Sequence, residues 1–100
     1  MPVIADFILP GLSREDYDRV RAAVGWLDQP PTGGIAHLTW WDGDDCHNID
    51  AWQDEAALAA FIESRLGPAM AELGIQVEPQ VTFHAAHELF APEAIRITAT

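Results

Sequence analysis

The chain has 100 residues, a formal net charge of −11 and only five Lys and Arg residues. This acidic balance excludes nucleic acid and anionic membranes as expected partners, because both require clustered cations. The length is that of one domain, residues 1–100, with a single modest core. A lone cysteine, Cys46, excludes an internal disulfide framework, and no stretch reaches the roughly 18 apolar residues of a membrane span. We therefore expect a soluble, cytoplasmic protein.

The first strand and the first helix follow directly from the residue pattern. Val3–Leu9 is apolar with a single charge and stops at Pro10-Gly11, which predicts a strand. Ser13 can then cap a helix that runs to Gly25 and has acidic residues in its first turn. Anionic side chains are favoured there by the helix dipole.

A β-hairpin is predicted after the Pro- and Gly-rich loop, with strands Ile35–Trp41 and Cys46–Trp52 and a turn at Gly43-Asp44. Its register places three pairs opposite each other on one face: His37 with Asp50, Thr39 with Asn48, and Trp41 with Cys46. We expect the other, apolar face to contact the helices through Ala36, Leu38, Trp40, Ile49 and Ala51. The polar face then holds an imidazole beside a carboxylate, flanked by hydroxyl, amide and indole groups.

The second half of the chain predicts one long helix and one more strand. Asp54 can cap a helix that ends at Gly74, and Gly67-Pro68 predicts a kink or break within it. Gln80–Ala86 alternates apolar and polar residues as a fourth strand. In the tail, Ala94–Thr98 has the composition of a short strand that would reach a partner subunit.

The order of these elements is β-α-β-β-α-β. It is typical of the ferredoxin-like α+β fold, an antiparallel four-stranded sheet with both helices on one face. The face away from the helices would carry Ile4, Ile8, Trp41 and Trp52, together with His84. A monomer would expose this apolar patch, so we expect a two-fold homodimer joined through the sheet faces.

The element order and the segment IDAWQDEAALAAF, residues 49–61, resemble the dimeric α+β barrel superfamily, and within it antibiotic-biosynthesis monooxygenase (ABM)-type domains. The resemblance covers most of residues 1–90. It implies a dimeric α+β barrel and a small enzyme of monooxygenase, polyketide cyclase or isomerase chemistry. Heme-degrading members place an axial His on the second helix, but this chain has no histidine between His47 and His84. We therefore expect no heme and no other cofactor.

His37 and Asp50 are the candidate catalytic residues. A carboxylate next to an imidazole orients the ring and makes it a usable acid or base near neutral pH. The same pair is also compatible with a purely structural role, as a cross-strand ion pair buried at a dimer interface. The sequence leaves both interpretations open.

The remaining candidates are substrate-binding residues on the same predicted face: Trp41, Trp52, Asn48, His84 and Thr39. The indoles can stack on a flat aromatic ligand or fill a dimer interface. His37, His84, Asp50 and Asp6 could offer nitrogen and oxygen ligands in one cavity. No short metal-ligand motif accompanies them, so we expect no metal.

Two reactive side chains are predicted to have no chemical role. Tyr17 would point from the first helix toward the sheet as part of the core. Cys46 lies beside the acidic run Asp42–Asp45, which opposes the lowered pKa that a thiolate nucleophile needs.

Three functions remain compatible with these features. The first is a small cofactor-independent enzyme acting on an aromatic or polyketide-like small molecule, with His37 as base and Asp50 orienting it. In an oxygenase of this kind the substrate itself, as an enolate, would reduce dioxygen. The second is a non-catalytic, stress-related dimer that binds a small ligand, and the third is a metal- or heme-binding protein. Only the resemblance ranks the enzyme first.

Overall fold

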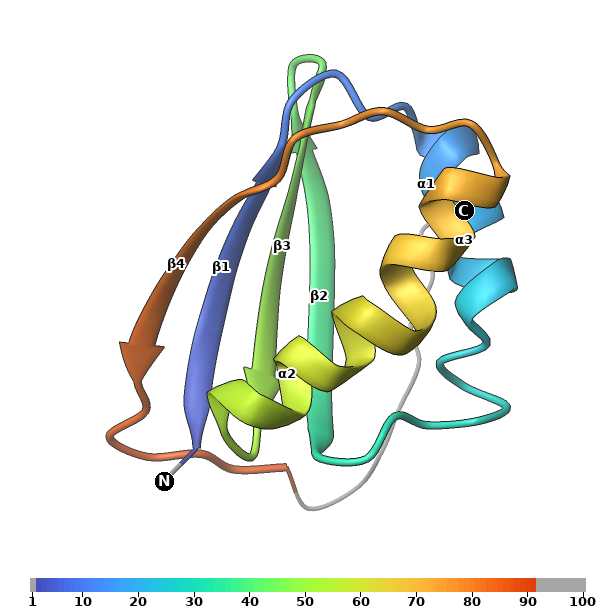
Figure 1. The fold of residues 1–100 in the computed structure, drawn as a ribbon. Coiled ribbons are helices and arrows are strands. Elements are labelled where there is room, and N and C mark those ends of the chain that lie inside the picture. Colours follow the sequence, from blue (N-terminus) through green and yellow to red (C-terminus); the bar gives the residue numbers. More distant parts are fainter. Residues whose placement is uncertain (1, 92–100) are drawn as a thin grey trace.

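The computed structural model describes residues 2–91 and contains one antiparallel sheet with helices on one face (Figure 1). Along the chain the elements are β1 (Val3–Leu9), α1 (Arg14–Val24), β2 (Gly34–Asp42), β3 (Asp45–Trp52), α2 (Glu55–Phe61), the π-helical turn η1 (Ile62–Leu66), α3 (Gly67–Glu72) and β4 (Gln80–Ala85). The strand order is β2-β3-β1-β4, with every neighbouring pair antiparallel. The predicted α+β fold is confirmed, whereas the predicted strand Ala94–Thr98 lies outside the described residues.

Helix α1 is bounded by the two residues that the sequence indicated. The hydroxyl of Ser13 accepts a hydrogen bond from the amide of Asp16 at 3.1 Å, which satisfies one free donor of the first turn. Gly25 ends the helix in the left-handed region at φ 62°, and its amide donates to the carbonyl of Arg21. A residue without a side chain adopts this conformation at little cost.

The second predicted helix continues through Gly67-Pro68 by widening its hydrogen-bond pattern. Asp54 caps its start by accepting from the amide of Ala57 at 2.8 Å. Before the proline, η1 forms a π-turn in which the amide of Gly67 donates to the carbonyl of Ile62. Proline has no amide hydrogen and its ring collides with a regular helical carbonyl, and the wider turn relieves both problems. The expected kink or break is thus a π-turn.

The faces of β2 and β3 are opposite to those predicted. Asp50 pairs with Ala5 of β1 on one side and with His37 of β2 on the other. Residues that pair across a ladder share a face, so His37 and Asp50 lie on the helix-covered face with the buried Ala5. Leu38 and Trp40 point away from the helices and are 60% and 45% exposed. The prediction that Ala36, Leu38, Trp40, Ile49 and Ala51 contact the helices is therefore wrong.

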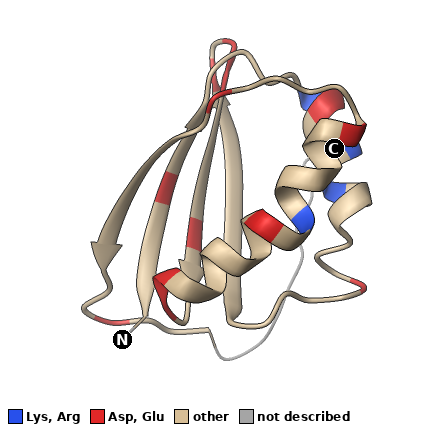
Figure 2. Ribbon diagram, in the orientation of Figure 1, with Lys and Arg blue, Asp and Glu red and all other residues tan. Residues whose placement is uncertain are grey.

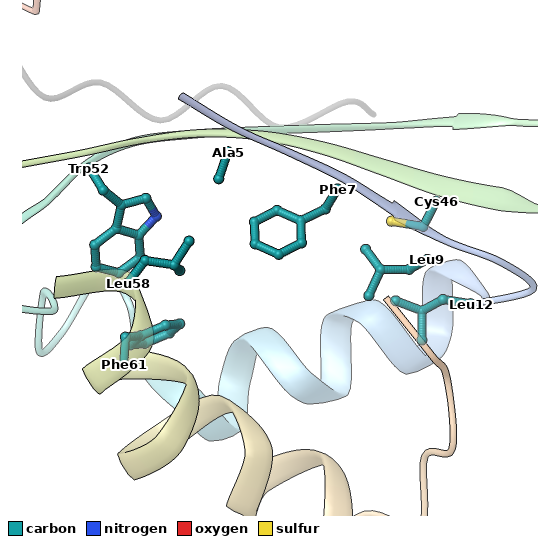
Figure 3. Packing of buried hydrophobic residues seen from close by; sticks show 8 residues of the cluster. All are labelled: Ala5, Phe7, Leu9, Leu12, Cys46, Trp52, Leu58 and Phe61. Carbon is teal, nitrogen blue, oxygen red and sulfur yellow. The ribbon is translucent and has the colours of Figure 1, made fainter. Parts of the chain in front are cut away.

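The core lies between the sheet and the helices, as Figure 3 shows. Its buried members are Ala5, Phe7, Leu9, Leu12, Cys46, Trp52, Leu58 and Phe61. Trp52 is fully buried, with its ring 5.4 Å from Trp26 and 5.3 Å from Phe61 between centroids. The placement of Trp41 and Trp52 on a dimer face is wrong, because both indoles lie on the helix side of the sheet.

The outer face of the sheet, defined here by Ile4, Ile8, Leu38, Trp40 and Ile49, is mainly apolar, with the carboxylate of Asp6 between the two isoleucines of β1. The ring of Trp40 stacks on His47 with centroids 5.2 Å apart. The arginines of the described residues all lie on α1 and η1, away from this face (Figure 2). Within residues 2–91, no helix combines the length and the apolar character needed to cross a membrane.

Candidate active site

His37 and Asp50 form the predicted cross-strand pair at the middle of the β2–β3 ladder. The distance from His37 Nδ1 to Asp50 Oδ1 is 2.6 Å, and Asp50 Oδ2 accepts a hydrogen bond from the indole of Trp52 at 3.2 Å. Asp50 is only 6% exposed. A carboxylate accepts hydrogen bonds and donates none, so the imidazole carries its proton on Nδ1. The pair therefore fixes the ring and directs Nε2 toward α1.

Tyr17 of α1 completes a chain of hydrogen bonds at this site. Its hydroxyl lies 2.6 Å from His37 Nε2, and it is the donor in the tautomer that carries the imidazole proton on Nδ1. The two rings are nearly parallel, with centroids 5.9 Å apart. Burial, with smaller contributions from nearby Cys46 and Asp50, raises the pKa of Tyr17 from 10.0 to about 12. The phenol is thus a neutral donor at neutral pH.

The role of Tyr17 was missed because the hairpin faces were assigned the wrong way round. Tyr17, Val20 and Val24 lie on one side of α1 at helical spacing, the side that meets the sheet. With His37 on the helix-covered face, this spacing would have placed the phenol opposite the imidazole. The signal was present in the sequence, but it depended on the strand faces.

A second set of polar groups lies on the same face, nearer the hairpin turn. The hydroxyl of Thr39 lies 3.5 Å from the sulfur of Cys46, and this thiol donates to Asn48 Oδ1 at 3.7 Å. The pKa of Cys46 is raised, so the side chain stays a thiol; the cause is burial, whereas the sequence had pointed to the acidic run beside it. Asn48 also carries two amide donors beside that oxygen, which can bind an anionic ligand atom.

Two tryptophans form aromatic walls around the imidazole and the phenol. Trp26 lies 5.7 Å from His37 and Trp41 lies 5.6 Å from Tyr17, both between ring centroids. The indole of Trp41 donates to the carbonyl of Leu12 at 2.7 Å, which fixes its orientation. Trp26 was not predicted as a site residue. These walls suit a flat aromatic molecule.

His84 does not join this group. It pairs with Ile4 of β1, and Asp6 lies on the same side of β1 as Ile4, so both His84 and Asp6 belong to the outer side of the sheet. The expectation that they share a cavity with His37 and Asp50 is wrong. Within residues 2–91, no three His, Cys, Asp or Glu side chains gather closely enough to hold a metal ion.

Two shallow depressions open on the surface near the aromatic walls. One, of about 280 Å³, is lined by Arg21, Ala22, Gly25, Trp26, Leu27 and Asp28. The other, of about 210 Å³, is lined by Pro30, Pro31, Thr32, Ala57, Ala60, Phe61, Ser64 and Arg65. Trp26 borders the first depression and its ring also lies beside the imidazole of His37, so one indole joins the depression to the pair.

The chain is a small α+β protein in which the His37–Asp50 pair lies between the sheet and the helices. No family model matches the chain, and no curated protein is significantly similar to it. Among solved structures, a variant of SnoaB, a cofactor-independent oxygenase from Streptomyces nogalater, has a TM-score of 0.65 and 14% identity over 92% of this chain and 98% of that chain. A second SnoaB structure has a TM-score of 0.59 and 17% sequence identity, over 92% of this chain and 97% of that chain. NE2512 of Nitrosomonas europaea, a protein of unknown function, has a TM-score of 0.68 and 17% sequence identity, over 94% of this chain and 98% of that chain. These likenesses show a shared fold.

Proposed function

We propose that this protein is a small cofactor-independent enzyme that transfers a proton on an aromatic or polyketide-like substrate. Monooxygenase, cyclase and isomerase reactions all begin with such a step. The observation that carries the proposal is the bond of 2.6 Å between His37 Nδ1 and the buried Asp50 carboxylate, which leaves Nε2 as the basic atom. An imidazole held in this way has the orientation that a general base needs.

Each group of the site has a distinct task in this reaction. His37 takes the proton from the substrate, and the carboxylate of Asp50 stabilises the imidazolium that forms. Trp26 and Trp41 hold the flat ring, and the amide of Asn48 binds the oxygen on which negative charge develops. In the oxygenase version, the resulting enolate donates an electron to dioxygen. The shared fold with SnoaB, an oxygenase that needs no cofactor, supports this version.

The outer face of the sheet is proposed to bind a second copy of this chain. Its exposed Leu38 and Trp40 would be covered by the same face of the partner, as a two-fold dimer requires. The centre of the face carries no arginine and a single carboxylate, Asp6. Two such faces can therefore meet without the repulsion expected from the net charge of −11.

The proposed function is tested by turnover of anthrone, a tricyclic ketone whose enolate reacts with dioxygen. Oxygen uptake and the absorbance of the quinone product would be measured for wild type, His37→Ala and Asp50→Asn. We expect His37→Ala to lose ~10²-fold or more, the usual contribution of a general base. His87→Ala, a change at an exposed histidine beyond β4, is the matched control and should keep wild-type turnover. Equal turnover of His37→Ala and wild type would refute the proposal.

One observation favours a second candidate, a non-catalytic dimer that binds a small ligand and serves in a stress response. Neither of the two surface depressions is lined by His37 or Asp50. In that case anthrone would bind, as seen by a change in tryptophan fluorescence, but would oxidise no faster than in buffer. His37→Ala would then leave the affinity for anthrone unchanged.

A further inference from the structure

We propose that Tyr17 is the catalytic residue that meets the substrate, and that it relays a proton from a hydroxyaromatic ligand to His37. The inference deepens the proposed function and rests on it, because it assumes that His37 is the final proton acceptor. It gives a chemical role to Tyr17, which the sequence analysis predicted to be a core residue. It also names the substrate class as a flat aromatic ring with an acidic hydroxyl group, a phenol or an enol.

The hydrogen bonds of the site leave no free basic atom on the imidazole. Nδ1 is bonded to Asp50 and Nε2 to the hydroxyl of Tyr17, each at 2.6 Å. A substrate can therefore reach the imidazole only by displacing the phenol. The oxygen of Tyr17 is different, because a hydroxyl that donates its one hydrogen still has lone pairs to accept another. The phenol oxygen is thus the atom of the chain that can still accept a hydrogen bond from a ligand.

The protonation state of Tyr17 suits a relay and does not suit direct base catalysis. Burial raises the pKa of Tyr17 to about 12, so a tyrosinate is scarcely populated at neutral pH. In the relay, the O–H bond of the substrate breaks as a new O–H bond forms on Tyr17. The original O–H bond of Tyr17 breaks as an N–H bond forms on His37 Nε2. The products are a substrate anion, a neutral Tyr17 and an imidazolium paired with Asp50.

The surroundings of Tyr17 favour a flat, ionisable aromatic ligand. The edge-on contact with Trp41 and the neighbouring Trp26 provide apolar walls. Arg21 lies one turn along α1 from Tyr17 and lowers its pKa through its charge, against the larger effect of burial. The same guanidinium borders the 280 Å³ depression beside Trp26. A cation at this place stabilises the anion that the relay produces.

The relay is tested with p-nitrophenol, whose neutral and ionised forms absorb at different wavelengths. Wild type at saturating protein should raise the ratio of phenolate to phenol by ~10-fold over the free probe, because the imidazolium favours the nearby anion. Tyr17→Phe keeps the ring and its contact with Trp41 but removes the oxygen. It should still bind the probe, with the ratio returned to that of the free probe. His37→Ala should lose the rise, and His87→Ala should keep it.

The outcomes separate this inference from the function on which it rests. A full rise with Tyr17→Phe would mean that the ligand meets His37 directly, which overturns the relay and leaves the proposed function intact. A full rise with His37→Ala would overturn both. Failure of wild type to bind or ionise the probe would overturn the relay, whereas anthrone turnover tests the function independently.

A second measurement keeps the relay testable if Tyr17→Phe does not fold. Tyr17 is the only tyrosine of the chain, so biosynthetic incorporation of fluorotyrosine labels this residue alone. The fluorine resonance should shift when p-nitrophenol saturates the protein, since the probe forms a hydrogen bond with the labelled phenol. An unchanged resonance at saturation would overturn the proposal.

Discussion

The two faces of the sheet carry similar residue types but organise them differently. On the helix-covered face, the polar atoms of Tyr17, His37, Asp50 and Trp52 form one continuous chain of hydrogen bonds. On the outer face, the ring of Trp40 stacks on His47, and Leu38 is 60% exposed. Buried polar groups are costly unless they are paired, and large exposed apolar groups are costly unless they are covered.

An indole or an imidazole on a strand does not by itself identify a functional site. Trp52 lies on the helix-covered face and Trp40 on the outer face. The indole N–H of Trp52 donates to a buried carboxylate, whereas Trp40 is 45% exposed. We propose chemistry at the inner face because its polar atoms are paired. We propose a partner surface at the outer face because its apolar side chains are exposed.

The largest expected effect is the loss of Asp50 from the inner face. Asp50→Ala leaves the imidazole of His37 and the indole of Trp52 without their acceptor in a buried place. We expect a loss of about 3 kcal/mol in the free energy of unfolding, measured in urea by tryptophan fluorescence. Asp6→Ala removes a half-buried carboxylate from the outer side of the neighbouring strand and should cost less than about 1 kcal/mol. Equal losses for the two variants would show that the hydrogen-bond chain does not stabilise the fold.

The next effect concerns assembly through the outer face. Wild type should have the mass of a dimer in light scattering at micromolar concentration. Trp40→Lys should weaken the dimer by roughly 30-fold, from the loss of about 2 kcal/mol of apolar burial, and should change the unfolding of the monomer little. Val81→Lys is the matched control, because Val81 is 44% exposed, against 45% for Trp40, but lies on the helix side of β4. A monomer mass for wild type would refute the dimer.

The elements of this fold could be predicted because they depend on local signals. Ser13 and Gly25 bound α1 as expected, since an oxygen acceptor at the start and a left-handed residue at the end act within one turn. The pairing of His37 with Asp50 also followed, because the hairpin register depends on the turn and on the residues beside it.

The faces of the hairpin could not be assigned from alternation alone. Leu38 and Trp40 are more apolar than His37 and Thr39, so the usual rule places the wrong set against the helices. The rule fails here because the inner polar groups satisfy one another, which removes most of the cost of burying them. Because the faces were assigned the wrong way round, Tyr17 was not predicted as a site residue. For the same reason His84 was expected on the same face as His37. Information from β1, whose Ala5 pairs with Asp50, was needed to correct this assignment.

The smallest predicted effect is a change in the alkaline behaviour of the inner face. Tyr17 is the only tyrosine of the chain, so the absorbance of tyrosinate reports on this residue alone. Its midpoint should lie at about 12 instead of the ordinary pKa of 10.0. The folded protein then binds more protons than the unfolded chain between these values, so its stability falls as the pH rises through them. Below pH 10.0 the contribution is fully present, and it is lost as the pH passes about 12.

Two variants give this titration its control. Tyr17→Phe should lack the alkaline loss of stability, because no phenol remains to titrate. His37→Ala should keep a midpoint nearer 12 than 10.0, because burial is the largest cause of the raised pKa of Tyr17. A wild-type midpoint at 10.0 would place the phenol in water, away from the imidazole. The hydrogen-bond chain of the inner face would then end at His37 and would not include the phenol.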